Sequence, residues 1–338
     1  MRTEQDYNLL PHNTFGIAAR CKRFVEYATT EEARILACQL TLADGPLLLL
    51  GGGSNLLLTR DFPGTVLHSA IRDMAIATDG DNVLVSAGSG MECDALVDYC
   101  VEHGYYGMEN LSLIPGEVGA SAVQNIGAYG AEACDIIYKV EAVCLADGSV
   151  TTIDRDECQY GYRDSRFKHE WRNRYLITHV TYCLSRLFKP RLDYGNIRDE
   201  LLRQGIGEQP TARQLRDVVI GIRREKLPDH HVTGNAGSFF VNPVVSQDKC
   251  RELLNEWPDM PHYNLGDRGV KVPAGWLIEQ CGWKGRTLGH AGVHDRQALV
   301  LVNRGDATGA EVFALCETIR DDVRKRFGIE ITPEVNIV

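Results

Sequence analysis

The chain has 338 residues, of which 44% are hydrophobic and 24% charged, and its net charge at pH 7 is −10. The length allows two or three domains with sizeable cores, and the composition is typical of a globular protein. The negative charge argues against nucleic acid or an anionic membrane as the main partner, so an anionic ligand would need a local basic pocket. Apolar runs are far shorter than the ~20 residues of a membrane-spanning helix, and the polar start of the chain does not resemble a signal peptide.

The 11 cysteines are odd in number and form no Cys-x-x-Cys pair. This pattern predicts neither a disulfide framework nor a structural zinc site, and it favours the reduced cytoplasm as the compartment. His290 and His294, and the adjacent His230 and His231, are possible metal-ligand pairs. Glycines around the first pair argue against a rigid helical arrangement, so we expect no metal.

Residues 1–69 are predicted to form a first, small subdomain. The first 25 residues show no clear hydrophobic period and are predicted to be extended and irregular. An amphipathic helix is expected at 31–42, followed by strands at 47–50 and 56–59. The glycine-rich turn Gly51-Gly52-Gly53-Ser54-Asn55 separates these two strands.

Residues 70–205 are predicted to form a second subdomain. Ser89-x-x-Glu92 has the spacing of a capping box, and the apolar helical pattern after it would end at Gly104. Asp147-Gly148 predicts a hairpin turn. The strands expected in this region are 83–87, 136–145, 150–153 and 175–184.

The segment 114–130 is small and apolar, with four glycines and almost no charge. Such a composition is poor for a helix and poor for an exposed loop. Glycine lets the backbone approach a large flat ligand closely, and Gln124 and Asn125 add amide groups that can donate and accept hydrogen bonds. From this segment alone, a tight buried turn is an equally good interpretation.

Residues 206–328 are predicted to form a third domain, and 329–338 a strand that returns from it. Thr211 would cap a helix that ends before Pro228, and Thr308-x-x-Glu311 is a second capping box before a helix that ends at Gly328. The other elements expected are a turn-rich stretch at 234–243, a helix at 273–281 and a strand at 298–303. Strands, helices and hairpins together indicate the α+β class.

Several common functional motifs are missing. The chain has no Walker A sequence, and Gly88-Ser89-Gly90 does not continue as Gly-x-Gly-x-x-Gly, which weakens a nicotinamide-binding Rossmann interpretation. Ser238 does not lie on a nucleophile elbow, because Ala236 and Phe240 stand where that motif needs glycines.

Other motifs occur together, in an order typical of one family. They are Leu50-Gly51-Gly52-Gly53-Ser54-Asn55, the run 114–130, Tyr162-Arg163-Asp164-Ser165-Arg166-Phe167, Gly234-Asn235-Ala236-Gly237-Ser238-Phe239-Phe240, Ala274-Gly275-Trp276-Leu277-Ile278 and Pro333-Glu334-Val335. On these motifs nearly the whole chain resembles the UDP-N-acetylenolpyruvoylglucosamine reductases, flavoenzymes that complete UDP-N-acetylmuramate for bacterial peptidoglycan. Tyr194 resembles the substrate-closing tyrosine of the longer form of that family.

The resemblance implies an FAD-binding fold of the vanillyl-alcohol-oxidase type, made of two α+β subdomains, and a third α+β domain for the substrate. It implies that NADPH reduces FAD and that hydride then passes to C3 of the enolpyruvyl ether. Related oxidases often carry a histidine near the glycine turn for covalent attachment, and Ser54-Asn55 here favours dissociable FAD. Backbone N–H groups of the turn could cradle the pyrophosphate, and 114–130 would line the flavin ring. The implied FAD-binding residues are Gly51, Gly52, Gly53, Ser54, Asn55, Pro115, Gly116, Gly119, Ala120, Gln124, Asn125, Ile126 and Gly127.

The resemblance also implies three catalytic residues. Arg163 and Glu334 would act on the enolpyruvyl carboxylate, and Ser238 would protonate C2. From the residues alone, each has an ordinary alternative: a surface ion pair for Arg163, a water-facing edge position for Glu334 and a turn hydroxyl for Ser238. The implied substrate-binding residues are Tyr194, Lys226, Asn242, Tyr263, Lys284 and Gln297, of which the lysines could instead be solvated surface charges.

The sequence alone is also compatible with two other functions. A different enzyme of the same flavin fold would oxidise an alcohol or a sugar, with covalent flavin or rapid use of oxygen. A non-catalytic nucleotide-sugar-binding protein would be colourless. For the reductase interpretation we expect a cytoplasmic monomer that meets a UDP-sugar and NADPH and has no nucleic-acid or membrane partner.

Overall fold

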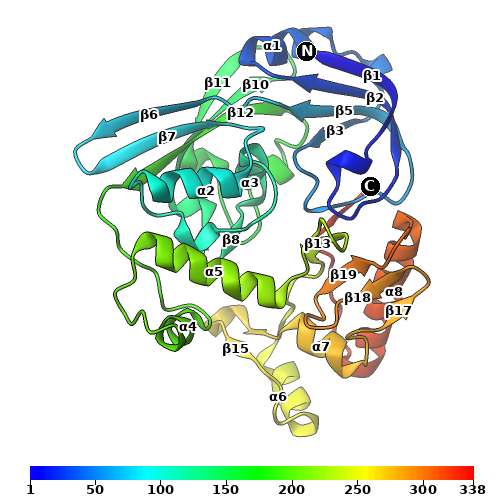
Figure 1. Cartoon of the computed structure of the whole chain (residues 1–338). Coiled ribbons are helices and arrows are strands. Elements are labelled where there is room, and N and C mark those ends of the chain that lie inside the picture. The colour runs from blue at the N-terminus through cyan, green and yellow to red at the C-terminus, as the bar shows by residue number, and fades with distance from the viewer. The chain divides into compact units, whose positions relative to one another are not determined.

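The computed structural model describes all 338 residues. They divide into two compact units. Figure 1 labels helices and strands of the chain. Unit 1 comprises Met1–Tyr7, Cys21–Gly52 and Pro63–Arg224, and unit 2 comprises Asn8–Arg20, Gly53–Phe62 and Glu225–Val338. No helix combines the length and the apolar character that crossing a membrane requires. The four-part domain division at residues 69, 205 and 328 stays a prediction.

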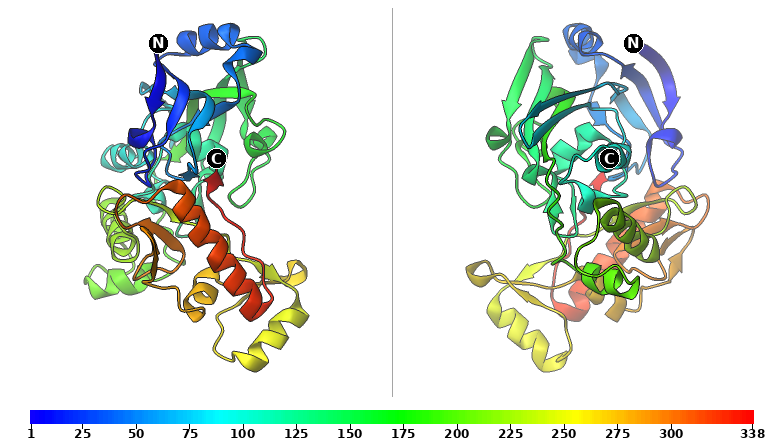
Figure 2. Two further views of the ribbon diagram at one scale, coloured as in Figure 1. Left: turned by 90° about the vertical axis from the view of Figure 1, so that its right-hand side faces the viewer. Right: turned by 60° about the vertical axis from the view of Figure 1, so that its left-hand side comes forward.

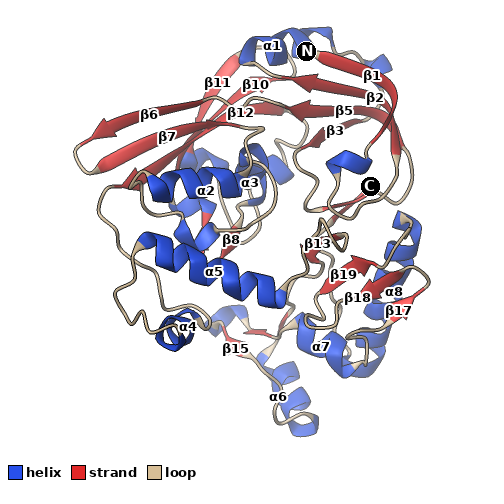
Figure 3. Ribbon diagram, viewed as in Figure 1, coloured by secondary structure: helices blue, strands red, loops and turns tan.

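Unit 1 contains two main sheets (Figure 3). The first has the order β1-β2-β5-β3, with β1 (Arg2–Asn8), β2 (Arg20–Tyr27), β3 (Leu47–Leu50) and β5 (Phe62–Ser69). The second has the order β11-β10-β12-β7-β6 and is antiparallel throughout, with β6 (Met74–Asp79), β7 (Asn82–Gly88), β10 (Ile137–Cys144), β11 (Val150–Asp154) and β12 (Tyr175–Ser185). A short antiparallel pair is formed by β8 (Gly127–Ala128) and β9 (Ala131–Glu132).

The helices of unit 1 follow the apolar pattern of the sequence. They are α1 (Thr30–Gln39), α2 (Cys93–Glu102), α3 (Val118–Gln124), α4 (Ile197–Arg203) and α5 (Ala212–Lys226), the last of which ends just beyond the unit's limit at Arg224. Leu96 of α2 and Val118 of α3 share one buried core with Val85 and Val180 of the antiparallel sheet. These two short helices therefore lie on a face of that sheet, and burial of their apolar side chains is what stabilises them.

Unit 2 is built around a long helix and three small sheets. The sheets are β13-β19-β18-β17, β14-β16-β15 and β20-β4, the last a parallel pair. The strands are β4 (Leu56–Leu57), β13 (Asn235–Ser238), β14 (Val244–Val245), β15 (Tyr263–Asn264), β16 (Val270–Lys271), β17 (Thr287–Leu288), β18 (Ala291–Val293), β19 (Val300–Asn303) and β20 (Asn336–Ile337). The helices are α6 (Gln247–Glu256), α7 (Ala274–Gln280) and α8 (Gly309–Phe327).

Helix α8 fixes the path of the C-terminal segment in unit 2. Its predicted capping box is confirmed: Glu311 N–H donates to Thr308 Oγ1 at 3.2 Å, and Thr308 N–H donates to Glu311 Oε2 at 2.9 Å. Arg320 Nε donates to the carbonyl of Ile331 at 3.0 Å, so the segment after the helix runs back along it (Figure 2). This return brings β20 to its partner β4.

Most of the other predicted elements are confirmed, including the hairpin between β10 and β11 and the helix that Thr211 caps. The prediction that the first 25 residues are irregular is wrong, because β1 and β2 are strands. None of the β1 residues is buried, since β1 is the edge strand of its sheet, and this explains why no apolar alternation marks it. The C-terminal strand is also shorter than predicted, because regular pairing is limited to β20.

The capping box predicted at Ser89 and Glu92 does not form. Helix α2 begins after Glu92, and Glu92 makes no side-chain capping bond. Ser89 is buried and its hydroxyl bonds to that of Ser69 at 2.6 Å. Motif spacing alone does not show whether a hydroxyl caps a helix or joins two strands.

Candidate functional site

Two glycine-rich stretches of unit 1 approach each other closely. A Cβ atom on Gly51 would lie 3.2 Å from Cβ of Ala120, and one on Gly52 would lie 3.3 Å from Cα of Gly116. These separations leave little room for a side chain on either glycine. Gly51, Gly52 and Gly116 therefore form a tightly packed glycine cradle. That this backbone approaches a large flat ligand stays a prediction.

Val118–Gln124 forms helix α3, contrary to the prediction that this stretch is a poor helix. Backbone bonds to the preceding segment hold its start: Gly119 N–H donates to the carbonyl of Ser89 at 2.9 Å, and Val118 N–H donates to that of Met91 at 2.9 Å. A Cβ atom on Gly119 would come within 2.8 Å of Cβ of Ser89. Tertiary contact thus overrides weak helix propensity here.

Gln124 and Asn125 differ in what their amides bond to. The Asn125 side chain is fully engaged: it donates to Glu132 Oε2 at 3.0 Å and to the carbonyl of Gly161 at 2.8 Å, and it accepts from Cys134 N–H at 2.9 Å. The buried Nε2 of Gln124 has no hydrogen-bond partner. An unpaired buried amide is costly, so Gln124 has donor capacity available for a ligand.

Arg163 lies against the same glycine-rich stretch. Its guanidinium donates to the carbonyls of Gly127 at 2.5 Å and Asn125 at 3.4 Å, and it lies 5.2 Å from the ring centre of Tyr162. Its backbone is in the left-handed region, with φ of 56°. The alternative of a simple surface ion pair does not describe these contacts, which tie the cation to the backbone of the site.

The predicted glycine turn 51–55 continues into unit 2 at Gly53. Gly53 has φ of +61°, and a Cβ atom there would lie 2.0 Å from the carbonyl oxygen of His12, so only glycine fits. Asn55 Nδ2 donates to the carbonyl of Glu334 at 3.3 Å, and Asn336 N–H donates to the carbonyl of Asn55 at 3.1 Å. Unit 2 therefore brings the end of this turn together with the C-terminal motif.

The segments that carry Ser238 and Glu334 are neighbours in unit 2. Glu334 N–H donates to the carbonyl of Phe239 at 2.8 Å, and Val241 N–H donates to the carbonyl of Thr332 at 2.9 Å. Ser238 is exposed at the end of β13, Glu334 is half-buried, and Phe239 and Phe240 are buried behind them. The backbone segments that carry Ser238 and Glu334 are thus hydrogen-bonded to each other, and the Ser238 side chain is exposed.

The six predicted substrate residues are dispersed over both units. Tyr194 of unit 1 is 58% exposed, and Tyr263 of unit 2 is 56% exposed. Lys284 pairs with Glu279 at 2.9 Å, and Lys226 ends α5. The two amide side chains accept backbone hydrogen bonds: Asn242 Oδ1 accepts from Ala274 N–H at 2.9 Å, and Gln297 Oε1 accepts from Leu299 N–H at 3.3 Å. Exposure leaves the two tyrosines accessible to a ligand.

Sequence reasoning missed Arg223, on α5 of unit 1. Its Nε donates to the carbonyl of Leu113 at 3.2 Å, directly before the glycine-rich stretch. Burial lowers the pKa of the Arg223 guanidinium, and the positive charge of Arg163 acts in the same direction. Two cations therefore face this stretch, which suits an anionic ligand. The only sequence signal is an arginine that directly follows the buried Ile222 in a helical pattern.

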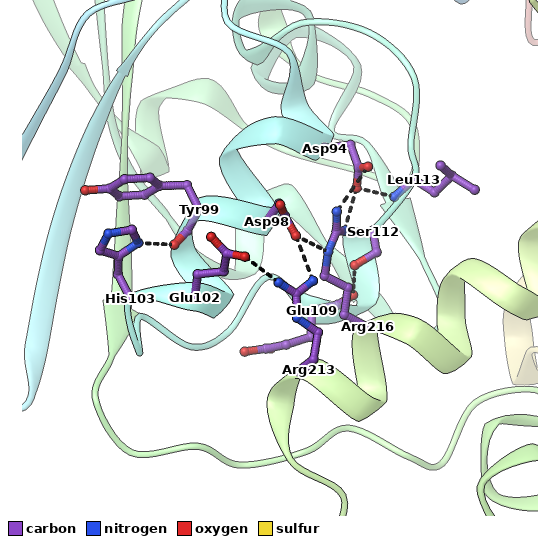
Figure 4. A network of polar contacts seen from close by, with 10 residues as sticks. All are labelled: Asp94, Asp98, Tyr99, Glu102, His103, Glu109, Ser112, Leu113, Arg213 and Arg216. Carbon is purple, nitrogen blue, oxygen red and sulfur yellow. Dashed lines mark hydrogen bonds and ion pairs between the residues drawn. The ribbon is translucent and has the colours of Figure 1, made fainter. Parts of the chain in front are cut away.

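An ion-pair network joins α2 to α5 in the same region (Figure 4). Arg216 is buried and donates to Asp94 at 2.6 Å and to Asp98 at 3.0 Å. Asp94 Oδ1 also accepts from Leu113 N–H at 2.5 Å. Leu113 has φ of 57° and is thus held on both sides, by Asp94 and by Arg223, at the start of the glycine-rich stretch.

The structure contains one group of side chains with metal-ligand spacing. Ligand atoms of Asp229, His230 and His231 lie within 4.8 Å of one another, and Asp229 and His231 are exposed. All 11 cysteines are free. That function needs neither metal nor disulfide stays a prediction.

Comparison with known proteins defines the class of this chain. Residues 22–154 match the family profile described as FAD binding domain, and residues 228–338 match UDP-N-acetylenolpyruvoylglucosamine reductase, C-terminal domain. With the α+β fold and the glycine cradle, these matches identify an FAD-dependent oxidoreductase with the FAD-binding fold of the vanillyl-alcohol-oxidase type. The predictions of fold class and of FAD as cofactor are confirmed.

Full-length relatives identify the family. UDP-N-acetylenolpyruvoylglucosamine reductase of Bacteroides fragilis (strain YCH46) is 51% identical over 99% of this chain and 100% of its own length. The protein of that name from Pseudomonas aeruginosa is 48% identical over 100% of this chain and 99% of its own length. The chain belongs to the UDP-N-acetylenolpyruvoylglucosamine reductase family, as the motifs predicted.

Two solved structures are similar in fold. UDP-N-acetylenolpyruvylglucosamine reductase from Thermus caldophilus has a TM-score of 0.69 at 24% identity, over 100% of this chain and 99% of that one. Substrate-bound p-cresol methylhydroxylase has a TM-score of 0.50 at 14% identity, over 98% of this chain and 84% of that one. At these identities the likeness bears on the fold alone.

Proposed function

We propose that this chain reduces UDP-N-acetylenolpyruvoylglucosamine to UDP-N-acetylmuramate for peptidoglycan synthesis, with NADPH as the electron donor. The observation that carries the proposal is the 51% identity, over 99% of the chain, to a relative that bears the reductase name. When bound in the glycine cradle, FAD would supply the redox chemistry, by which hydride (two electrons and a proton) from NADPH would reach C3 of the enolpyruvyl ether. One further proton is then needed at C2.

FAD fits the residues of the cradle. The close approach of Gly51 and Gly52 to the stretch 116–120 leaves backbone as the surface toward a ligand, and the unpaired amide of Gln124 could donate to a flavin carbonyl. The engaged side chain of Asn125 suggests that this residue contributes by holding the turn. The proposal includes all of the predicted FAD-binding residues, and FAD would be bound without a covalent link.

Three side chains would act on the enolpyruvyl group. Arg163 has a fixed fork and a permanent charge suited to a carboxylate on which negative charge develops. Glu334 would lie beside that carboxylate. Ser238 would give its proton to C2, and the burial of Phe239 and Phe240 behind it supports a hydroxyl held in a fixed place.

The remaining parts of the proposal concern the substrate and the setting. Tyr194, Lys226, Asn242, Tyr263, Lys284 and Gln297 would contact the UDP-sugar. The net charge of −10 supports a protein without a nucleic-acid or anionic-membrane partner. Reduced cysteines throughout support the cytoplasm as the compartment. The working form in this proposal is a monomer.

Spectroscopy of the purified full chain tests this function. We expect a yellow protein whose colour is released by acid precipitation, whose flavin absorbance is bleached by NADPH without oxygen, and whose absorbance returns when UDP-N-acetylenolpyruvoylglucosamine is added. Return of absorbance with oxygen or an alcohol but not with this substrate would favour an oxidase. A colourless protein would favour a nucleotide-sugar-binding role.

A further inference from the structure

A buried histidine lies between two carboxylates in unit 1, directly beneath the glycine cradle. His68 on β5 is 4% exposed. Its Nδ1 is 3.0 Å from Glu26 Oε2, and its Nε2 is 3.1 Å from Glu117 Oε1. The reaction proposed above makes no use of these three side chains.

This geometry requires a proton. A neutral imidazole has one N–H donor and one acceptor nitrogen, whereas an ionised carboxylate can only accept. With His68 neutral, one carboxylate oxygen would face a nitrogen lone pair at hydrogen-bond distance. With His68 protonated, both contacts are charge-assisted hydrogen bonds, and the trio carries one negative charge instead of two.

Glu117 transmits this arrangement to the cradle. It is the residue before α3, and an added Cβ on Gly51 would lie 3.4 Å from Glu117 Oε2, the oxygen not bonded to His68. An added Cβ on Gly52 would lie 3.8 Å from Glu117 Cγ. One carboxylate is thus held by His68 on one side and lies against the Gly51–Gly52 turn on the other.

We propose that His68 is a positioning residue: the proton it holds between Glu26 and Glu117 fixes Glu117 against the Gly51–Gly52 turn, so that FAD is held tightly while His68 is protonated and more loosely once it is neutral. This inference rests on the proposed place of FAD in the glycine cradle. Loss of the proton also leaves a second negative charge beneath a cofactor whose pyrophosphate is anionic, which acts in the same direction.

The surrounding groups support titration of His68 above the ordinary range. Burial alone would lower the pKa of His68, but the hydrogen bonds and charges of Glu117 and then Glu26 outweigh it and raise that pKa above 6.5. Arg2 on β1 lies 3.9 Å from Glu26, and the ring of Phe24 stacks on His68. Other titratable groups near Glu117 stay protonated at neutral pH, because burial raises the pKa of Tyr27 well above its usual range and that of Cys93 to about 12.

The sign of the pH effect follows from the raised pKa. A group whose pKa is raised in the folded state stabilises that state fully at low pH. This stabilisation is lost as pH rises through the folded-state pKa. For His68 this window lies above pH 6.5. FAD retention should therefore fall as pH rises above about 6.5, the reverse of what a titrating carboxylate would cause.

Release of FAD from the holoenzyme tests the proposal. The dissociation rate would be followed between pH 5.5 and 8.5 by the rise in flavin fluorescence after dilution. We expect the dissociation rate to increase by about fivefold or more across this range, a usual size for the coupling between two sites. The increase should follow the titration curve of a single proton. His68→Gln should release FAD at a nearly constant rate close to the high-pH value of the unmodified protein.

Control variants separate positioning from general damage. His179 on β12, which bonds to Asp73 at 3.3 Å, is a second histidine–carboxylate pair in unit 1, and His179→Gln should keep the normal pH curve. If His68→Gln does not fold, Glu26→Gln replaces it: removal of one carboxylate should move the midpoint to lower pH, and NMR of isotope-labelled histidine should show the same shift for His68.

The possible outcomes are distinct. A flat curve for the unmodified holoenzyme, an unchanged curve in His68→Gln, or an unmoved midpoint in Glu26→Gln would overturn the role of His68 while leaving FAD binding intact. A full chain that holds no FAD, or that holds FAD equally well after Gly51→Val, would instead overturn the proposed place of the cofactor.

Discussion

The glycine-rich stretch of unit 1 and the Ser238 segment of unit 2, both proposed as parts of the site, differ in how they are built. In unit 1, Val118 and Gly119 are held by backbone bonds to the segment before α2, and a Cβ atom added to Gly119 would collide with Ser89. In unit 2, Ser238 is exposed on a short strand, and a Cβ added to Gly237 would meet nothing within 4 Å. The first region is defined by backbone shape, and the second by the side-chain atoms it exposes.

This difference indicates how each region can fail. A backbone-shaped cradle is sensitive to a single added methyl group but makes few demands on side-chain chemistry. An exposed reactive side chain tolerates added volume but loses its function when one atom is removed. Changes in the unit 1 stretch should therefore affect FAD retention, and changes at Ser238 should affect turnover of protein that retains its FAD.

The largest effect is expected from Ser238→Ala. Loss of the proton donor should leave FAD bound and reduced by NADPH at the normal rate, while reoxidation by the enolpyruvyl substrate slows by about two to four powers of ten. Anaerobic stopped-flow on the separate half-reactions measures this, and Ser238→Cys should lose less. Slow flavin reduction with normal reoxidation would show that the role is wrong.

Ser246→Ala is the matched control in the same unit. Ser246 Oγ accepts from Lys249 N–H and caps α6. Its removal should lower the free energy of unfolding by about 1 kcal/mol and leave both half-reactions unchanged. The control thus distinguishes loss of a proton donor from loss of a structural hydroxyl.

Arg163→Ala should have the next largest effect, a fall in turnover of about two to three powers of ten. Because the guanidinium also donates to the carbonyls of Asn125 and Gly127, Arg163 tests whether a side chain in the backbone-shaped region acts on chemistry or on the cofactor. We expect flavin content to stay normal. A protein that has lost its FAD would assign Arg163 to the cradle instead.

Arg166→Ala is the control for Arg163. Arg166 lies 4.1 Å from the ring centre of Trp171 and pairs with Glu170, so it is a neighbouring arginine with partners outside the glycine-rich stretch. Turnover should stay close to normal, since a surface ion pair contributes little. Turnover of Arg163→Lys should lie between that of Arg163→Ala and that of Arg166→Ala, because lysine keeps the positive charge but not the planar, two-pronged donor geometry of arginine.

The sequence predicted most of the fold because local patterns decided it. The apolar period of α5 and the capping box of α8 act within a few residues, and both are confirmed. The edge strand β1 was missed because none of its residues is buried and so no apolar alternation marks it. Helix α3 was missed because contacts with a distant segment hold its start, and no local pattern records those contacts.

The same distinction holds for the site. The motifs identified the family and hence the cofactor, whereas the approach of the glycine-rich backbone to a flat ligand stays a prediction. Sequence could not show that the glycine turn 51–55 is divided between the two units, or that Glu117 bonds to His68, because these facts depend on which distant residues the fold brings together. Arg223 was missed for the same reason.

The smallest effect comes from a matched pair of helical glycines in unit 1. A Cβ on Gly119 would lie 2.8 Å from Cβ of Ser89, so Gly119→Ala must displace α3 and the cradle. Overpacking of this kind costs about 1–3 kcal/mol, so FAD affinity should fall by roughly fivefold to a hundredfold.

Gly221→Ala on α5 is the matched control. A Cβ on Gly221 meets nothing within 4 Å, so this variant should raise the free energy of unfolding by about 1 kcal/mol and leave FAD affinity unchanged. FAD release and denaturant unfolding, measured on both variants, check this pair. Equal loss of FAD from both would mean that helix packing in general, and not the shape of the cradle, governs cofactor retention.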